Sequence, residues 1–237
     1  MILVKASKTK QRILDVSLML FNLRGERLVT TNHIAEALQM SPGNLYYHYR
    51  NKQQIIDALF QQYQQSIFNV LAIPENRQVT GEDKIQYFRQ LNHQLWHYRF
   101  LHRDVQYLLD YNEQFKEKYQ HFLIEVMLQA RRIYEAFVVA GLMRISSEEI
   151  EALIINIWLI LTNWMNFLQG IGLNKQEQLS ERWMWYGLRQ ILFLEAPYLT
   201  QESHLNDQQL MAGTKNFNFF VKLAELKSIN NEKIRTI

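Results

Sequence analysis

Apolar residues recur at helical spacing through most of the chain, and capping residues separate one periodic run from the next. The first run covers residues 7–24, and Gly25 follows as a residue suited to the positive φ that ends helices. Its apolar positions share one helix face: Ile13, Val16, Leu20 and Phe21. This run predicts a helix that packs one face against a core.

Two capping signals predict short helices close behind the first. Thr30 is a suitable N-cap for a second helix, and Ser41 followed by Pro42 marks the start of a third, which ends near residue 49. Only residues 39–41 separate the two. A first helix followed by two short, closely joined helices is the layout of a helix-turn-helix unit.

The remainder of the chain continues as helices. Asn51 with Gln54 resembles a capping box, and Ser146 with Glu149 resembles another. The later helices are predicted at residues 52–72, 82–101, 104–110, 112–140, 147–170 and 176–196. The fold class is therefore predicted to be all-α.

Composition agrees with a helical chain. Glycine and proline contribute 8 and 3 of the 237 residues, too few for the turns of a sheet-rich fold. The absence of cysteine excludes a disulfide framework and a thiol nucleophile. Hydrophobic residues make up 48%, which excludes disorder of the chain as a whole.

One segment is long and apolar enough to be considered as a membrane span. Residues 152–174 carry no charge over 23 positions, a length that can cross a bilayer. Its polar residues fall within one arc of about 140°: Asn156, Thr162, Asn163, Asn166, Gln169 and Asn174. This stripe favours an amphipathic core helix. No signal peptide is recognised either, so a cytoplasmic location without a membrane partner is expected.

The helix-turn-helix region resembles the TetR family of bacterial transcriptional regulators over residues 8–60. The motifs that carry the resemblance are Arg12-Ile-Leu-Asp, Leu20-Phe21, Gly25, Thr30-Thr31, Ile34-Ala35 and the run SPGNLYYHYRNK from Ser41 to Lys52. The resemblance implies an N-terminal three-helix DNA-binding domain followed by a C-terminal helical bundle for regulation and dimerisation.

Charge supports the same division. Residues 1–56 carry eight basic and three acidic residues, whereas residues 57–212 carry thirteen basic and eighteen acidic ones. A basic module beside an acidic body predicts that only the module meets a polyanion. The expected parts are a DNA-binding domain in 1–56, a ligand-binding and dimerisation domain in 57–212, and a basic tail in 213–237. Whether that tail is a dimer arm or disordered is left open.

The resemblance also implies which residues contact DNA. Thr30 and Thr31 match phosphate contacts, and Asn32 matches a position that reaches a base. In the third helix and beyond, the matching positions are Gly43, Asn44, Tyr46, Tyr47, His48 and Lys52. Alternatives remain for single members: Tyr46 as a packing residue, His48 in a local hydrogen bond, and Lys52 as a solvated lysine. Leu45 and Tyr49 are expected in the core.

Two features of the turn and the third helix are specific to this chain. Family members usually place glycine where Gln39 stands, and a left-handed glutamine costs about 1–2 kcal/mol, so the turn is expected to differ slightly. Residues 41–49 contain no Arg or Lys, which disfavours bidentate reading of guanine. Asn44 favours adenine, so an operator with mainly A·T specific positions is expected.

The body is expected to hold an effector cavity and a dimer interface. The predicted ligand contacts are Trp96, Phe100, Tyr107, Tyr111, Tyr134 and Phe137, with ordinary core packing as the alternative. The last two body helices resemble a pair that forms a four-helix dimer bundle. Their predicted interface residues are Asn156, Asn163, Trp183, Tyr186, Gly187, Ile191 and Leu194. Gly187 would permit close approach of a partner helix. The two asparagines are open to pairing across the two-fold axis, lining the cavity or facing water.

Catalytic and metal motifs are weak. His93 and His97 lie one helical turn apart near His102, a spacing that can bind Zn²⁺, but without a cysteine or an obvious carboxylate neighbour. Gln94 excludes an HExxH motif. Neither a resident metal nor a cofactor is expected, and the chain is predicted not to be an enzyme.

Together these observations predict a homodimeric, ligand-responsive regulator of transcription. It would be a repressor released from a palindromic double-stranded operator by a small apolar or aromatic effector. The alternative is a helical effector- or metal-binding protein without operator binding, which a salt-independent response to duplex DNA would favour.

Overall fold

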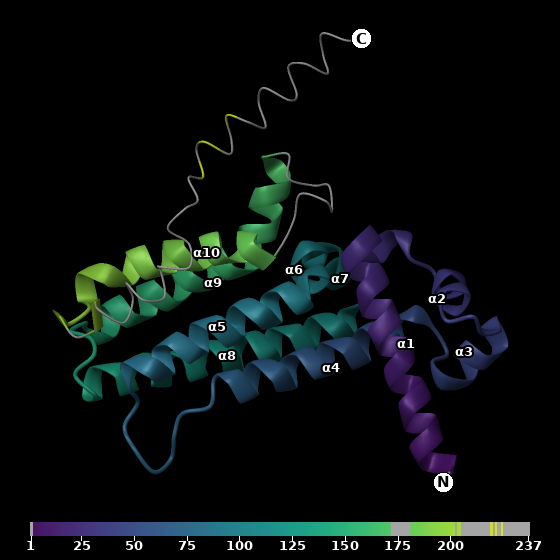
Figure 1. Cartoon of the computed structure of the whole chain (residues 1–237), viewed down its shortest axis with the longest axis horizontal. Coiled ribbons are helices and arrows are strands. Elements are labelled where there is room, and N and C mark those ends of the chain that lie inside the picture. Colours follow the sequence, from purple (N-terminus) through teal and green to yellow (C-terminus); the bar gives the residue numbers. More distant parts are fainter. Residues whose placement is uncertain are drawn as a thin grey trace. The chain divides into compact units, whose positions relative to one another are not determined.

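The computed structural model describes residues 2–171, 181–201, 203–204, 219, 221 and 224. Apart from one isolated β-bridge between Met143 and Leu199, the regular structure of these residues is helical, which confirms the all-α class (Figure 1). The helices are α1 (Ile2–Arg24), η1 (Glu26–Leu28), α2 (Thr31–Ala37), α3 (Pro42–His48), α4 (Lys52–Val70), α5 (Gly81–His97), α6 (Arg99–Arg103), α7 (Val105–Tyr111), α8 (Glu113–Val139), α9 (Ser147–Gly170), α10 (Glu181–Glu195) and η2 (Ala196–Tyr198). The predicted start of the last body helix, at residue 176, and most of the predicted tail lie outside the described residues.

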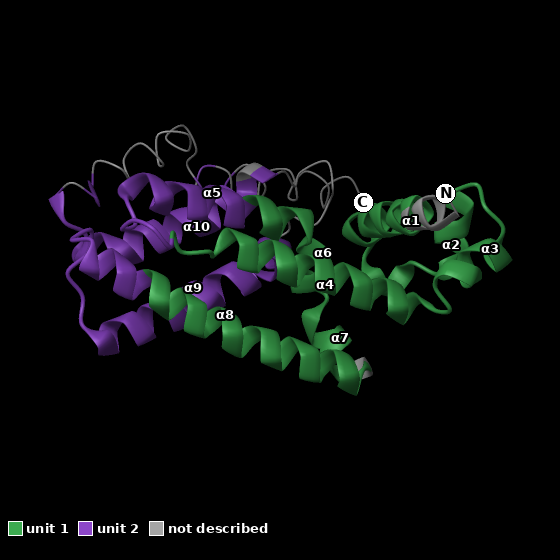
Figure 2. Ribbon diagram, turned by 90° about the horizontal axis from the view of Figure 1, so that it is seen from below, with its two compact units in different colours: residues 1–74, 93–133 green, residues 75–92, 134–237 purple. Residues whose placement is uncertain are grey.

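The chain divides into two compact units (Figure 2). Unit 1 comprises residues 1–74 and 93–133, and unit 2 comprises residues 75–92 and 134–237. Each unit is thus built from two separate stretches of sequence. The predicted functional boundaries at residues 56 and 212 follow a different criterion and stay predictions.

The predicted N-caps of unit 1 are confirmed at both short helices. The Thr30 hydroxyl accepts the N–H of His33 at 3.3 Å, and His33 Nδ1 accepts the N–H of Thr30 at 3.3 Å. A histidine therefore takes the place that Glu or Gln usually holds in a capping box. Ser41 caps α3 by accepting the N–H of Asn44 at 3.2 Å, with Pro42 in the first turn.

The capping box predicted at the start of α4 is only half formed. The Asn51 side chain accepts the N–H of Gln54 at 2.9 Å, as expected. The Gln54 side chain, however, accepts the N–H of Arg50 at 2.9 Å and not that of Asn51. It thereby ties down the residue that links α3 to α4.

Gln39, in the turn between α2 and α3, adopts the left-handed conformation with φ 54°. Its N–H donates to Glu36 O at 2.9 Å, and the N–H of Met40 donates to Ala35 O at 3.0 Å. These two bonds form a Schellman-type helix end, in which the left-handed position usually belongs to glycine.

Replacing Gln39 by glycine is expected to stabilise the protein by about 1 kcal/mol, because glycine adopts positive φ without the clash of a Cβ. Denaturant unfolding measures the change. Gln61→Gly, on an exposed face of α4, is the matched control and is expected to destabilise by a similar amount. A loss of stability in both variants would contradict the assignment of strain to Gln39.

The single helix predicted over residues 82–101 is wrong, because the chain breaks at Tyr98 between α5 and α6. A side chain from α1 stabilises the break. The buried Asn22 donates from Nδ2 to the carbonyl of His97 at 2.7 Å and accepts the N–H of Phe100 at 3.1 Å. One amide therefore satisfies the end of α5 and the start of α6, groups that a helix end leaves without partners.

The core of unit 1 contains aromatic side chains around a buried histidine. Tyr63 of α4 and His102 of α6 are hydrogen-bonded through the hydroxyl and Nε2, 2.9 Å apart. Burial lowers the pKa of His102 to about 4 and raises that of Tyr63, so both groups are neutral at pH 7. Phe60 packs against Phe115 and Phe122 of α8, with ring centroids 4.9 and 5.5 Å apart.

In unit 2, α9 and α10 pack through Gly187. A Cβ at this position would lie 2.8 Å from the ring of Trp164, so the indole lies directly on the backbone of α10. Trp164 Nε1 also donates to the carbonyl of Trp183 at 2.7 Å. The predicted close approach at Gly187 therefore occurs within the chain.

A buried ion pair lies elsewhere in unit 2. Lys84 and Glu195, both almost fully buried, are 2.8 Å apart. Tyr134 donates a short hydrogen bond to the same carboxylate. The three side chains connect α5, α8 and the end of α10.

By length and composition, α9 is the one helix of the described residues that could cross a membrane. Leu153, Met165 and Leu168 of α9 are buried inside unit 2. Its exposed face combines asparagines with apolar side chains: Asn156, Asn163, Ile155, Leu159 and Phe167.

Candidate nucleic-acid interface

The third helix, α3, exposes the positions predicted to read DNA. Tyr46 and Tyr47 are 61% and 81% exposed, which is unusual for large aromatic side chains. Gly43 and Asn44 are exposed as well, and His48 is half-buried. Leu45 and Tyr49 are buried on the opposite side, which confirms them as core residues.

The start of α2 lies beside this helix. Thr30 and Asn32 are exposed, and Thr31 is half-buried. Because the Thr30 hydroxyl serves as the acceptor in its cap, its proton stays available to donate to an anion. The hydroxyls of Thr30 and Thr31 and the amide of Asn32 therefore lie next to α3, the predicted recognition helix.

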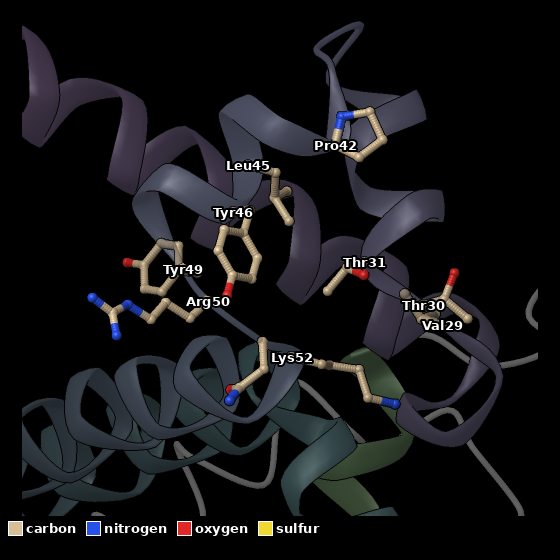
Figure 3. Close-up of a pocket in the computed structure, with 10 residues that line it drawn as sticks. Val29, Thr30, Thr31, Pro42, Leu45, Tyr46, Tyr49, Arg50 and Lys52 are labelled. Atoms are coloured by element: carbon tan, nitrogen blue, oxygen red, sulfur yellow. The ribbon is translucent and has the colours of Figure 1, made fainter.

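A hollow of about 510 Å³ connects these elements (Figure 3). It is lined by Val29, Thr30, Thr31, Pro42, Leu45, Tyr46, Tyr49, Arg50, Asn51 and Lys52. The start of α2, one side of α3 and the start of α4 thus share one concave surface. Besides two tyrosines, five of its ten lining residues have polar or cationic side chains: Thr30, Thr31, Arg50, Asn51 and Lys52.

Lys52 is bound by a carboxylate of unit 1. Its ammonium lies 2.6 Å from Glu26 Oε1 and donates to the backbone carbonyl of Glu26 at 3.1 Å. Figure 3 shows the side chain running from α4 toward Val29 and Thr30. The predicted phosphate contact of Lys52 therefore stays a prediction, and the sequence alone did not indicate its internal partner.

Arg50 is a candidate DNA contact that the sequence interpretation missed. Its side chain is exposed and extends beside Tyr49 at the rim of the hollow (Figure 3). Its backbone is held by Gln54, as described above. The sequence did contain a signal for this contact, because Arg50 is a lone cation between two capped helices. The DNA contacts of this region were predicted from the family resemblance alone.

The predicted ligand contacts fall into both units. Phe100 is fully buried against Phe21 of α1, with ring centroids 5.2 Å apart. The guanidinium of Arg99 lies over Trp96 at 4.0 Å, and that of Arg27 lies over Tyr107 at 4.5 Å. The remaining contacts are Tyr134 and Phe137, whose rings pack in unit 2, and Tyr111, whose side chain lies outside the described set.

The predicted dimer residues fall into a buried group and an exposed group. Trp183, Tyr186, Gly187 and Ile191 are buried inside unit 2, whereas Leu194 is exposed. Asn156 and Asn163 are also exposed, and each donates to a backbone carbonyl of its own helix, at 3.0 and 3.1 Å. Only the exposed residues are available to a partner without rearrangement.

The histidines considered for metal binding do not form a larger cluster. His93 and His97 stack with ring centroids 6.1 Å apart, and burial is the main cause that lowers the pKa of His97. Within the described residues, no group of three or more His, Cys, Asp or Glu side chains could hold a metal ion.

Two family models match the chain. One, described as bacterial regulatory proteins of the tetR family, matches residues 13–59. The other, described as a bacterial transcriptional repressor, matches residues 62–206. A curated relative, the uncharacterized HTH-type transcriptional regulator YvkB of Bacillus subtilis strain 168, is 33% identical over 63 residues. That match covers 27% of this chain and 33% of the length of YvkB.

Solved structures share the fold over most of the chain. A TetR-family transcriptional regulator from Marinobacter aquaeolei VT8 is 39% identical, with a TM-score of 0.75 over 84% of this chain and 98% of that one. A protein from Saccharomonospora viridis in complex with choline is 14% identical, with a TM-score of 0.62 over 82% of this chain and 100% of that one. The second similarity concerns the fold alone.

Proposed function

Because the chain belongs to the TetR family of bacterial transcriptional regulators, we propose that this DNA-binding protein is a repressor that leaves a palindromic operator when a small apolar or aromatic effector binds. Members of the family are regulators without enzymatic activity, in agreement with the prediction from the sequence. The observation that carries the proposal is the exposed face of α3, beside the threonines of α2 and the start of α4. We place its action in the cytoplasm, where bacterial DNA lies.

The exposed face of α3 suits reading of A·T pairs. Asn44 can pair with adenine through its amide, and Gly43 leaves room for a thymine methyl because nothing lies within 4 Å of a Cβ built there. Thr30, Thr31 and Arg50 then serve as phosphate contacts that set the register, whereas base edges supply specificity.

A homodimer is supported by an exposed apolar surface in unit 2. On α9 and α10, five large apolar side chains are 38–53% exposed: Ile155, Leu159, Phe167, Phe193 and Leu194. Exposed asparagines accompany them, and such mixed apolar surfaces mark protein interfaces. A symmetric dimer places its two recognition helices about 34–36 Å apart, one turn of DNA.

Coupling between effector and DNA is supported by contacts between α6 and α1. Arg103 donates to the carbonyls of Phe21 and Asn22 at 2.6 and 3.2 Å, which satisfies groups at the end of α1. Asp104 accepts the N–H of Glu26 at 3.0 Å. A displacement of α6 therefore moves the end of α1 and the segment that leads to Thr30. An effector that favours the displaced state lowers the affinity for DNA by its differential affinity for the two states.

The effector class follows from the aromatic side chains of the body. Trp96, Phe100 and Tyr107 lie in the same unit as Tyr63 and His102, two side chains that burial keeps neutral at pH 7. An apolar or aromatic molecule beside Tyr63 and His102 therefore meets two uncharged groups. The relative of known structure that holds choline shows that this fold accepts a small molecule.

Random-site selection is expected to return a palindrome whose specific positions are mainly A·T, and Asn44→Ala is expected to weaken its binding by about 1–3 kcal/mol. Fluorescence anisotropy at several salt concentrations measures the affinity of the protein for the operator and for an unrelated duplex. Asn69→Ala, on an exposed face of α4, serves as the control and should leave binding unchanged. A salt slope near zero for the unaltered protein would overturn the proposed operator binding, and a G·C-only core would overturn the assignment of Asn44.

A further inference from the structure

The ion pair between Glu26 and Lys52 joins the segment before α2 to the first residue of α4. The Glu26 side chain is 2% exposed and that of Lys52 is 28% exposed. Glu26 Oε1 and the Glu26 carbonyl take two of the three hydrogens of the ammonium. The second carboxylate oxygen, Oε2, is buried without a hydrogen-bond partner within the described residues. The carboxylate therefore depends on Lys52 for its compensation.

We propose that Glu26 competes with operator phosphate for Lys52 and thereby limits the affinity of the domain for duplex DNA. A carboxylate and a phosphate seek the same ammonium hydrogens, and Glu26 already occupies most of them at hydrogen-bond distance. A lysine neutralised in this way displaces fewer counterions from DNA than a free one. Because Lys52 lines the hollow beside Thr30 and Thr31, a phosphate bound there meets this competition directly.

The position of Glu26 is set from the junction between α6 and α7. Its N–H donates to Asp104 Oδ2 at 3.0 Å, and Asp104 also pairs with Arg103 at 3.0 Å. Arg103 in turn holds the carbonyl of Phe21 at the end of α1. A shift of this junction moves the carboxylate relative to Lys52, so the competition is adjustable. This inference rests on the proposed operator interface and adds to it a residue that tunes its strength.

Glu26→Gln tests the proposal in the full-length protein with a short duplex of unrelated sequence as the probe. Near 0.1 M salt, each DNA-binding domain is expected to bind the duplex about five- to tenfold more tightly. The slope of log affinity against log salt concentration should become steeper by about one for each domain. The amide keeps the shape of the side chain, and the partial exposure of Lys52 lets water solvate the released ammonium. Thermal unfolding verifies that the variant is folded.

Two further variants separate competition from a general charge effect. Glu36→Gln removes one exposed negative charge from α2 and is expected to change affinity by less than about twofold. In a Lys52→Gln background, the gain from Glu26→Gln should disappear. Persistence of that gain would assign it to the field of the carboxylate and overturn the proposal.

The remaining outcomes are also distinct. Weaker binding by folded Glu26→Gln would show that the carboxylate positions Lys52 for DNA, which overturns the competition. Normal DNA binding by the unaltered protein with no change in Glu26→Gln would overturn this inference alone. Absence of salt-dependent binding by the unaltered protein would overturn the proposed operator interface as well.

Discussion

Asn22→Leu is expected to destabilise the protein by about 2–4 kcal/mol, because it removes both hydrogen bonds that close the break between α5 and α6. The carbonyl of His97 and the N–H of Phe100 would lose their side-chain partner. Leucine has a similar volume, so the loss arises from unpaired backbone groups more than from a cavity. Urea unfolding followed by circular dichroism, at one protein concentration, measures the midpoint and the slope.

The control for this substitution is Asn69→Leu on α4, where the side chain is exposed and accepts only from Gln65 of its own helix. Its expected effect is within about 0.5 kcal/mol. Equal losses in the two variants would contradict the role assigned to Asn22. A midpoint shift with an unchanged slope would assign the loss to the native state.

Gly187→Leu is expected to destabilise unit 2 by about 3 kcal/mol, or to separate α10 from α9. The Cβ alone would lie 2.8 Å from the Trp164 ring, and a planar ring cannot bend away as a flexible side chain does. Movement of the indole would also break its hydrogen bond to the Trp183 carbonyl. The indole of Trp164 reports the change, so tryptophan emission and thermal unfolding measure the effect together.

Gly170→Leu provides the matched control at the end of α9, where nothing lies within 4 Å of an added Cβ. This variant should remain close to the original in stability, since leucine is a better helix former than glycine. If Gly187→Leu matched it, the close packing of α9 on α10 would be disproved.

Helix starts were predictable because their determinants are local. Thr30, Ser41 and Ser146 each cap a helix whose first residues are their immediate neighbours in the chain. The turn at Gln39 was expected to differ slightly because a left-handed glutamine is costly, but the structure keeps the left-handed conformation there. Leu45 and Tyr49 were correctly expected in the core.

Features that join distant residues were not predictable from one sequence. The break at Tyr98 depends on Asn22, whose hydrogen bonds span 75 and 78 residues. Lys52 fits a phosphate contact by its position, but its carboxylate partner lies 26 residues away, at the start of η1. Gly187 was expected to allow close approach of a partner helix, but the structure places it against Trp164 of the same chain, a neighbour that depends on how α9 and α10 pair.

The construction of unit 1 from two stretches of sequence constrains how the DNA-reading module can be transplanted. Phe21 relies on Phe100, Asn22 relies on the break after His97, and Glu26 relies on Asp104. During synthesis, the first 74 residues leave the ribosome before these partners do. A chimaera that joins this module to another regulator at residue 56 would therefore have to import residues 97–104 from the same parent.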